Sequence, residues 1–212
     1  MSVFRNEELI CPVCGQTFSA KVIMSYSVNG NFRSLDGDPH VPELFDMVCL
    51  CPHCGYAFTD PKEEADAYTR TIVHSENYQK VFQAEDVPET ARKLLLAGYL
   101  AEQKGDAGKA SVQYLHAYWF FRNNGLAGIE EARDKAIEGM EKYLESKADK
   151  HAAMVLVDLL RQKGAFEDAL DAVNSLGKYL KGDENLLKAG ALEWKLIMAG
   201  DAKEHMFGEV DR

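Results

Sequence analysis

Two nearly identical pentapeptides, CPVCG at residues 11–15 and CPHCG at residues 51–55, constrain this chain more than any other feature. A Cys-x-x-Cys turn places two sulfur atoms on one side of a tight bend, where one metal ion can bind both. The proline presets the turn, and the following glycine allows a positive φ and leaves N–H groups free to point at the sulfurs. Two such turns complete a tetrahedral site. The predicted ligands of a single structural zinc ion are Cys11, Cys14, Cys51 and Cys54.

The separation of the two turns is unusual for this motif. Between Cys14 and Cys51 lie 36 residues, whereas common zinc ribbons separate their pairs by about 15 to 20. Because the entropy of loop closure grows only logarithmically with length, the longer segment is compatible with one shared site. A thioredoxin-type redox role requires a single pair at a helix N-terminus, and a catalytic zinc keeps an open position, so both are disfavoured. The fifth cysteine, Cys49, is expected to fill a small buried apolar space.

Charge and hydropathy exclude several classes of protein. The formal net charge is -10, and residues 1–60 contain three basic and seven acidic side chains. Since nonspecific nucleic-acid affinity comes mostly from Lys and Arg, we expect no nucleic-acid partner. The N-terminus has no apolar signal-peptide region, and no apolar run is long enough to cross a membrane. We expect a cytoplasmic protein with no membrane partner, and reduced thiols in that compartment favour metal binding over disulfides.

The segment between the turns is predicted to form an antiparallel, zinc-bound sheet. "TFSAKVIMSYSV" and "ELFDMVC" have the alternation of strands and flank the turn-rich "NGNFRSLDGDPHVP". A carboxylate–histidine group in this excursion can bind a second metal or act in acid–base chemistry, which makes a metal-dependent enzyme the alternative function. Ordinary Asx turns with a surface ion pair are the simpler interpretation, so a non-enzymatic role is favoured. The residues concerned are Arg33, Asp36, Asp38 and His40.

These residues resemble a bacterial family, the domain of unknown function 2225. The resemblance rests on "CPVCGQTF", on Arg33 and "DGD" in the middle segment, and on "CPHCGYAF", followed by a mostly helical remainder. It covers roughly the whole chain, and "CPHCGYA" is its most specific marker. It implies a bacterial cytoplasmic protein with a zinc site on the four paired cysteines, and it assigns no activity. Cys49 lies outside the pattern.

Helix-forming residues dominate from about Pro61 onwards. Short connections rich in Gly, Asn and Asp predict antiparallel neighbours that pack pairwise. The predicted helices span 62–82, 89–104, 107–122, 127–146, 150–163, 166–180 and 184–199.

One helix pair resembles a tetratricopeptide repeat, because Gly98 and Ala110 allow close approach and Tyr114 fills the space above them. A second, degenerate match begins 59 residues later, which is not a multiple of the usual 34 or so, so an irregular array is expected. Such arrays leave a concave groove that holds peptides or protein elements. The side chains expected to face this groove are Arg92, Tyr99, Gln103, His151, Asp158 and Arg161.

The predicted fold class is therefore α+β. A small zinc ribbon-like β module over residues 1–61 precedes a larger all-α, tetratricopeptide-like helical domain over residues 62–212. The zinc ion would stabilise a sheet too poor in apolar residues to fold alone. The predicted function is a protein–protein interaction or scaffold module with a protein or peptide as its partner.

Overall fold

The computed structural model describes residues 3–27, 33–176 and 183–210, and the chain divides into two compact units. Unit 1 consists of Met1–Ser27 and Pro42–Ala136, and unit 2 of Val28–Val41 and Ile137–Arg212. Short strands around the cysteine turns precede a mainly helical remainder, which confirms the α+β class. The sequence predicted a boundary after residue 61 between two independently folding domains. That boundary stays a prediction.

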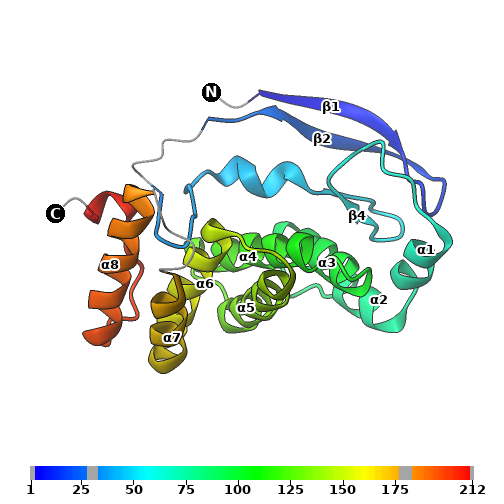
Figure 1. Ribbon diagram of the computed structural model, residues 1–212. Helices are drawn as coiled ribbons and strands as arrows, with labels where there is room; N and C mark the ends of the chain where they lie inside the picture. The colour runs from blue at the N-terminus through cyan, green and yellow to red at the C-terminus, as the bar shows by residue number, and fades with distance from the viewer. Residues whose placement is uncertain (1–2, 28–32, 177–182, 211–212) are drawn as a thin grey trace. The chain divides into compact units, whose positions relative to one another are not determined.

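Unit 1 begins with an antiparallel hairpin, whose strands lie side by side in Figure 1. Strand β1 (Val3–Ile10) pairs with β2 (Thr17–Ser25), and the first cysteine turn connects them. Only β2 was predicted. The sequence of β1, VFRNEELI, lacks the strong apolar alternation that marks a strand. In the structure none of its side chains is fully buried.

The prediction of a strand over "ELFDMVC" is wrong for most of its length. Pro42–Met47 forms a 3-10 helix, η2, which buries Leu44 and Phe45 together. An apolar pair at adjacent positions in a short segment does not distinguish a strand from a helical turn, which explains the error. Only the end of the segment is extended, where β3 (Cys49–Leu50) pairs with β4 (Ala57–Phe58) across the second cysteine turn.

The helical part of unit 1 follows the predicted helices closely, with one exception. In place of a single helix over 62–82 there are two short ones, because the Asp66 and Ser75 side chains cap separate N-termini. Tight packing of the next helix pair at Gly98 is confirmed, since a Cβ there would lie 2.7 Å from the Tyr114 ring. The helices are α1 (Ala67–Val73), α2 (Glu76–Phe82), α3 (Glu89–Gln103), α4 (Ala107–Asn123) and the first part of α5 (Ile129–Ser146).

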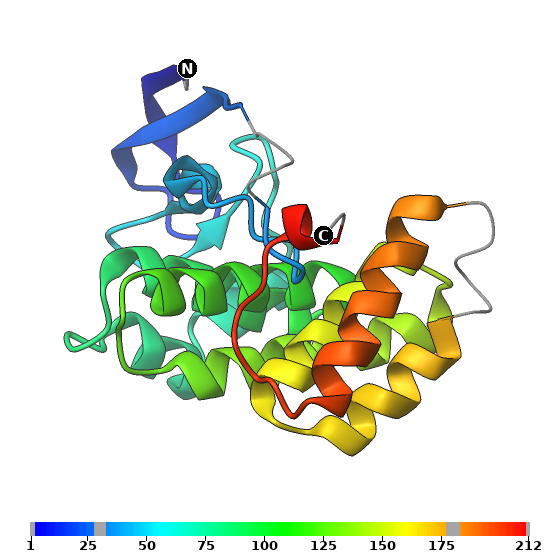
Figure 2. The same cartoon turned by 90° about the vertical axis from the view of Figure 1, so that its left-hand side faces the viewer.

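Unit 2 contains the remainder of α5 and three further helices that lie side by side in Figure 2, coloured yellow to orange. A short 3-10 helix, η3 (Phe207–Glu209), ends its described part. His205 and the first residue of η3 join residues 33–41 through backbone hydrogen bonds from Leu35 N to His205 O (2.9 Å) and from Phe207 N to Arg33 O (2.7 Å). The three helices are α6 (Lys150–Lys163), α7 (Phe166–Leu176) and α8 (Glu184–Met198).

Among the described residues, no helix combines the length and the apolar character needed to cross a bilayer.

Candidate metal centre

The two cysteine turns have the same backbone geometry. In the first, the N–H of Cys11 donates to the carbonyl of Gln16 (2.9 Å) and the N–H of Gly15 to that of Cys11 (2.8 Å). The second repeats both bonds between the equivalent residues, each at 2.9 Å. The glycine that closes each turn has a left-handed φ, 75° at Gly15 and 79° at Gly55, as the sequence predicted.

The two turns face one another and bring their four sulfur atoms together. The Sγ atoms of Cys11 and Cys54 are 3.6 Å apart, and those of Cys14 and Cys51 are 3.8 Å apart. All four sulfurs lie within 4.8 Å of one another. In a regular tetrahedron with metal–sulfur bonds of about 2.3 Å, each pair of sulfurs is about 3.8 Å apart. The four cysteines therefore lie close enough to bind one metal ion, and the two separations of 3.6 and 3.8 Å match those of a tetrahedral site.

Backbone N–H groups point at the sulfurs and partly offset the cost of their burial. Burial raises the pKa of Cys11 to about 11, although the N–H groups of Cys14 and Val13 act in the opposite direction. Burial raises the pKa of Cys54 even further above its usual range. For Cys14, burial also raises the pKa, but the N–H of Gln16 and the neighbouring thiols outweigh it, so its pKa is lowered. Such N–H donors orient thiolates in metal sites, and a bound cation supplies the remaining charge compensation.

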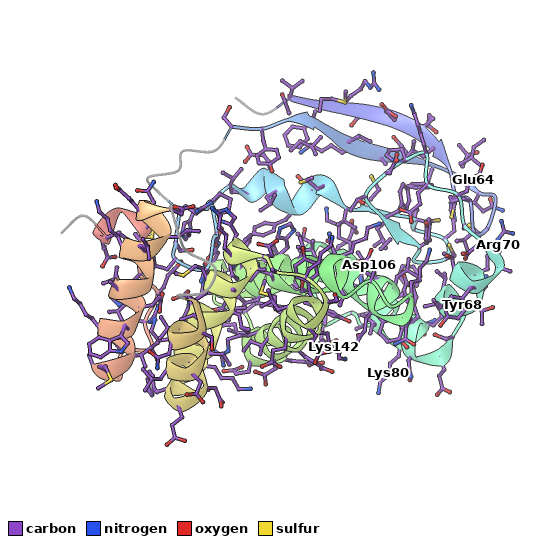
Figure 3. The ribbon with its side chains drawn as sticks, viewed as in Figure 1. Glu64, Tyr68, Arg70, Lys80, Asp106 and Lys142 are labelled. Carbon is purple, nitrogen blue, oxygen red and sulfur yellow. The ribbon has the colours of Figure 1, made fainter. Side chains whose placement is uncertain are left out.

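Helices α1 and α2 hold both turns from outside the cluster, through contacts that the sequence did not indicate. Figure 3 labels Arg70 on α1, whose guanidinium donates to the carbonyl of Pro12 in the first turn (2.9 Å). From α2, Tyr78 Oη donates to the carbonyl of Gly55 (2.9 Å), and Gln79 Nε2 to that of Cys54 (3.0 Å). The second turn is therefore part of the helical packing of unit 1.

The fifth cysteine does not belong to the cluster. Cys49 lies on β3, is 6% exposed and is not one of the four grouped sulfurs. Burial raises its pKa, which keeps the thiol protonated. This placement agrees with the expected role of Cys49 as a small buried side chain.

The sequence profile of a bacterial family, described as "uncharacterized protein conserved in bacteria (DUF2225)", matches residues 4–182. The chain belongs to this family. The matched range includes both cysteine turns and most of the helical remainder, and it confirms the resemblance seen in the sequence. Comparisons with curated proteins and with solved structures find no match. The family description assigns no function, so the functional argument rests on the geometry of the site.

The alternative site in the middle segment lies in unit 2, and the structure adds one residue to it. Asp38, His40 and Glu204 offer ligand atoms within 4.8 Å of one another. His40 Nε2 is 3.2 Å from Glu204 Oε1, and its backbone N–H donates to Asp38 Oδ1 (2.8 Å). Asp36 is fully buried and accepts the N–H of Asp38 (3.1 Å). The guanidinium of Arg33 lies over the Phe207 ring. Sequence spacing could not reveal Glu204, which follows 164 positions after His40.

The groove residues expected in unit 1 have different surroundings. Arg92 donates to the carbonyl of Ala84 (3.1 Å) and lines a hollow beside the second cysteine turn. Tyr99 packs edge to face on Tyr78, with ring centroids 5.9 Å apart. Gln103 is exposed at the end of α3, where its carbonyl accepts the hydroxyl of Tyr68. Arg92 thus borders a concave surface in unit 1.

Two of the groove residues expected in unit 2 are buried, so the structure corrects their assignment to an exposed groove. Asp158 and Arg161 have no exposed surface and form an ion pair. Arg161 also donates to Glu193 Oε2 (2.7 Å) and to the carbonyls of Asp201 and Lys203. Partners distant in the sequence accept hydrogen bonds from the Arg161 guanidinium, so this charged group can be buried. The third residue, His151, is exposed and lines a small cavity in unit 2.

Proposed function

We propose that the chain is a zinc-binding interaction protein of the cytoplasm, in which one structural zinc ion fixes a surface that binds a protein or peptide. The observation that carries this proposal is the grouping of the four sulfurs within 4.8 Å of one another, with Cys11 and Cys54 3.6 Å apart and Cys14 and Cys51 3.8 Å apart. Four cysteines at tetrahedral spacing close the coordination shell of zinc, which is the arrangement of structural rather than catalytic sites.

The proposed binding surface lies beside the second turn. A hollow of about 380 Å³ borders this turn, and its wall combines apolar side chains with acidic groups and one guanidinium. The Nε atom of Arg92 is buried and has no hydrogen-bond partner within the described parts of the chain. A carboxylate of a bound peptide would accept hydrogen bonds from the Arg92 guanidinium, and an apolar residue of the peptide would pack on Leu50 and Phe82. The lining residues are Leu50, Pro52, Phe82, Gln83, Glu85, Glu89 and Arg92.

Zinc and this surface are coupled through the chain itself. Pro52 lies between Cys51 and Cys54, and Leu50 directly precedes Cys51, so binding of the metal fixes the backbone on which both lining residues stand. Loss of the metal should therefore abolish partner binding at this hollow even where the helices remain folded.

The metal is tested by inductively coupled plasma mass spectrometry on protein purified without added metal, together with a titration of reactive thiols. We expect one zinc per chain, no rapidly reactive thiol in the folded protein, because four cysteines bind the metal and Cys49 is buried, and five reactive thiols after denaturation with a chelator. Iron in place of zinc would contradict the assignment of the metal, and disulfide-linked pairs without metal would contradict the site.

The partner surface is tested by quantitative crosslinking in bacterial cells that express the wild-type chain or a variant. A partner bound at the hollow should be crosslinked to the wild type, and this crosslink should be lost in Arg92→Ala and in Cys54→Ser. The matched control is Lys80→Ala, an exposed change on α2 that is absent from the lining of the hollow. Identical crosslink profiles for Arg92→Ala and the wild type would refute the assignment of the surface.

The second candidate function, a metal-dependent enzyme, is favoured by one observation, the group formed by Asp38, His40 and Glu204. Two carboxylates and an imidazole suit a divalent transition metal. This candidate requires a second metal ion per chain that is lost in His40→Ala, whereas the structural proposal requires the same metal content in that variant.

A further inference from the structure

A second cavity of unit 1, separate from the cysteine cluster, lies between β4 and the hairpin of α3 and α4. Its volume is about 250 Å³, enough for about eight water molecules at roughly 30 Å³ each. Alanines at three positions leave space that larger side chains would occupy. Its apolar wall consists of Ala57, Phe58, Ala97, Leu100 and Ala101, and its polar residues are Thr59, Glu63, Lys104, Asp106, Lys109 and Gln113.

Gln113 on α4 places an unsatisfied amide in this wall. Its side chain is 7% exposed, and its Oε1 atom is buried with no hydrogen-bond partner within 3–27, 33–176 and 183–210. A buried polar atom without a partner costs about 1 to 3 kcal/mol relative to one that is hydrogen-bonded. A ligand that brought a donor to Gln113 would recover this cost on binding.

Among the described residues, the charged groups of this lining leave one ammonium group without a carboxylate in ion-pair distance. Asp106, labelled in Figure 3, caps α4 by accepting the N–H of Lys109 (2.9 Å), and Glu63 lies 3.6 Å from the ammonium of Lys109. Lys104 donates to the hydroxyl of Thr69 (3.2 Å) and makes no ion pair within the described residues. An anionic group of a ligand would pair with Lys104.

The recognised groups come from both helices of the hairpin. Ala97, Ala101 and Lys104 lie on one face of α3, and Gln113 on α4 directly precedes Tyr114, whose ring contacts Gly98. The lining of the cavity therefore combines an ammonium group, an apolar wall and an amide acceptor.

We propose that this cavity binds a small monocarboxylate with an apolar body and a hydroxyl donor at the end far from the carboxylate. The carboxylate pairs with Lys104, the body packs on Phe58, Leu100 and Ala101, and the hydroxyl donates to Gln113. This site is independent of the partner surface beside the second cysteine turn, and its failure would leave the zinc proposal unchanged.

The probe for this site is 3-(4-hydroxyphenyl)propionate, added to the metal-loaded, ¹⁵N-labelled full chain. We expect saturable shifts of the backbone amide signals of the lining residues at ligand concentrations up to about 10 mM, the range in which weak small-molecule binding is detected. Two analogues each lack one of the recognised groups: 3-phenylpropionate lacks the hydroxyl, and 3-(4-hydroxyphenyl)propionamide lacks the carboxylate charge. Each analogue should bind about fivefold to tenfold more weakly than the probe.

Two variants assign these losses to individual side chains. Gln113→Leu should bind the probe and 3-phenylpropionate equally, and Lys104→Met should bind the acid and the amide equally. Lys80→Met, on the exposed surface of α2, is the matched control and should retain the wild-type preferences. The comparison of the three ligands on the wild-type chain decides the proposal even if a variant does not fold. The absence of saturable shifts at the lining residues, or equal affinity for all three ligands, would overturn it.

Discussion

The two cysteine turns allow the contact between Gly55 and Phe82 to be tested, because Gly15 occupies the equivalent position without such a contact. Gly15 and Gly55 occupy equivalent positions and have nearly the same φ, 75° and 79°. A Cβ on Gly15 would meet no atom within 4 Å, whereas a Cβ on Gly55 would lie 2.5 Å from Phe82 Cγ and 3.0 Å from Phe82 Cβ. Because these atoms are near the base of the side chain, rotation of Phe82 does not easily remove the clash. The variants Gly15→Ala and Gly55→Ala therefore differ mainly in packing against α2.

The expected magnitudes follow from this difference. An alanine in the left-handed region costs about 1 to 2 kcal/mol at either position. Overpacking adds about 1 to 3 kcal/mol at Gly55 alone, so Gly55→Ala should destabilise unit 1 by about 2 to 5 kcal/mol in total. The entropy that alanine removes from the unfolded chain is common to both variants and cancels in their comparison.

Unfolding by urea with zinc in excess measures this difference. The chain has two tryptophans, so in a Trp194→Phe background the fluorescence of the buried Trp119 reports on unit 1 alone. Adding Phe82→Ala to Gly55→Ala should recover the part of the loss that comes from overpacking. Equal free energies of unfolding for Gly15→Ala and Gly55→Ala, or no coupling with Phe82→Ala, would show that the second turn does not pack on α2 as described.

Three further predictions concern the metal, the helix hairpin and the buried charges. Cys54→Ser should lose the metal, as measured by metal analysis, and retain most of the helical circular dichroism; loss of all helicity would contradict this prediction. Gly98→Leu should destabilise the chain by about 1 to 3 kcal/mol because it overpacks the Tyr114 ring, and an unchanged melting temperature would refute this pairing. Burial, followed by the charge of Asp158, raises the pKa of Glu193 to about 9. The contribution of the protonated Glu193 to stability is fully present below the usual glutamate pKa of about 4.3 and is lost as the pH rises towards 9. Glu193→Gln cannot titrate, so the free energy of unfolding of this variant should depend less on pH between about 5 and 9. A slope unchanged from that of the wild type would contradict the assignment of this pKa.

The ligand set could be predicted from the sequence because its geometry is local. Each pentapeptide contains the proline, the two cysteines and the glycine that form its own turn, so only the meeting of the two turns depended on the rest of the chain. The capped break between α1 and α2 also has a local signal, in Asp66 and Ser75, but both residues are compatible with the helical periodicity around them. Strand β1 had no comparable signal, because its pairing with β2 decides its conformation.

The buried charges were not predictable for the opposite reason. Periodicity assigns charged residues to the surface, and Asp158 and Arg161 lie on one face of a helix at a spacing typical of an exposed pair. Their burial depends on Glu193, on the carbonyls of Asp201 and Lys203, and on Gln162, which also approaches Asp36. These partners come from distant parts of the chain, so their contribution exists only after unit 2 has folded.

The order in which the chain enters the two units gives the cysteine cluster a topological role. The chain leaves unit 1 after Ser27, returns after Val41, and leaves again after Ala136. A metal ion that joins Cys14 to Cys51 therefore closes a ring of backbone that contains the whole 28–41 stretch belonging to unit 2. A protease that cut this ring would leave two fragments joined by the metal as well as by the packing of β2 on η2 and β3. The metal would therefore add a cross-link to a ring of backbone whose segments are assigned to both units.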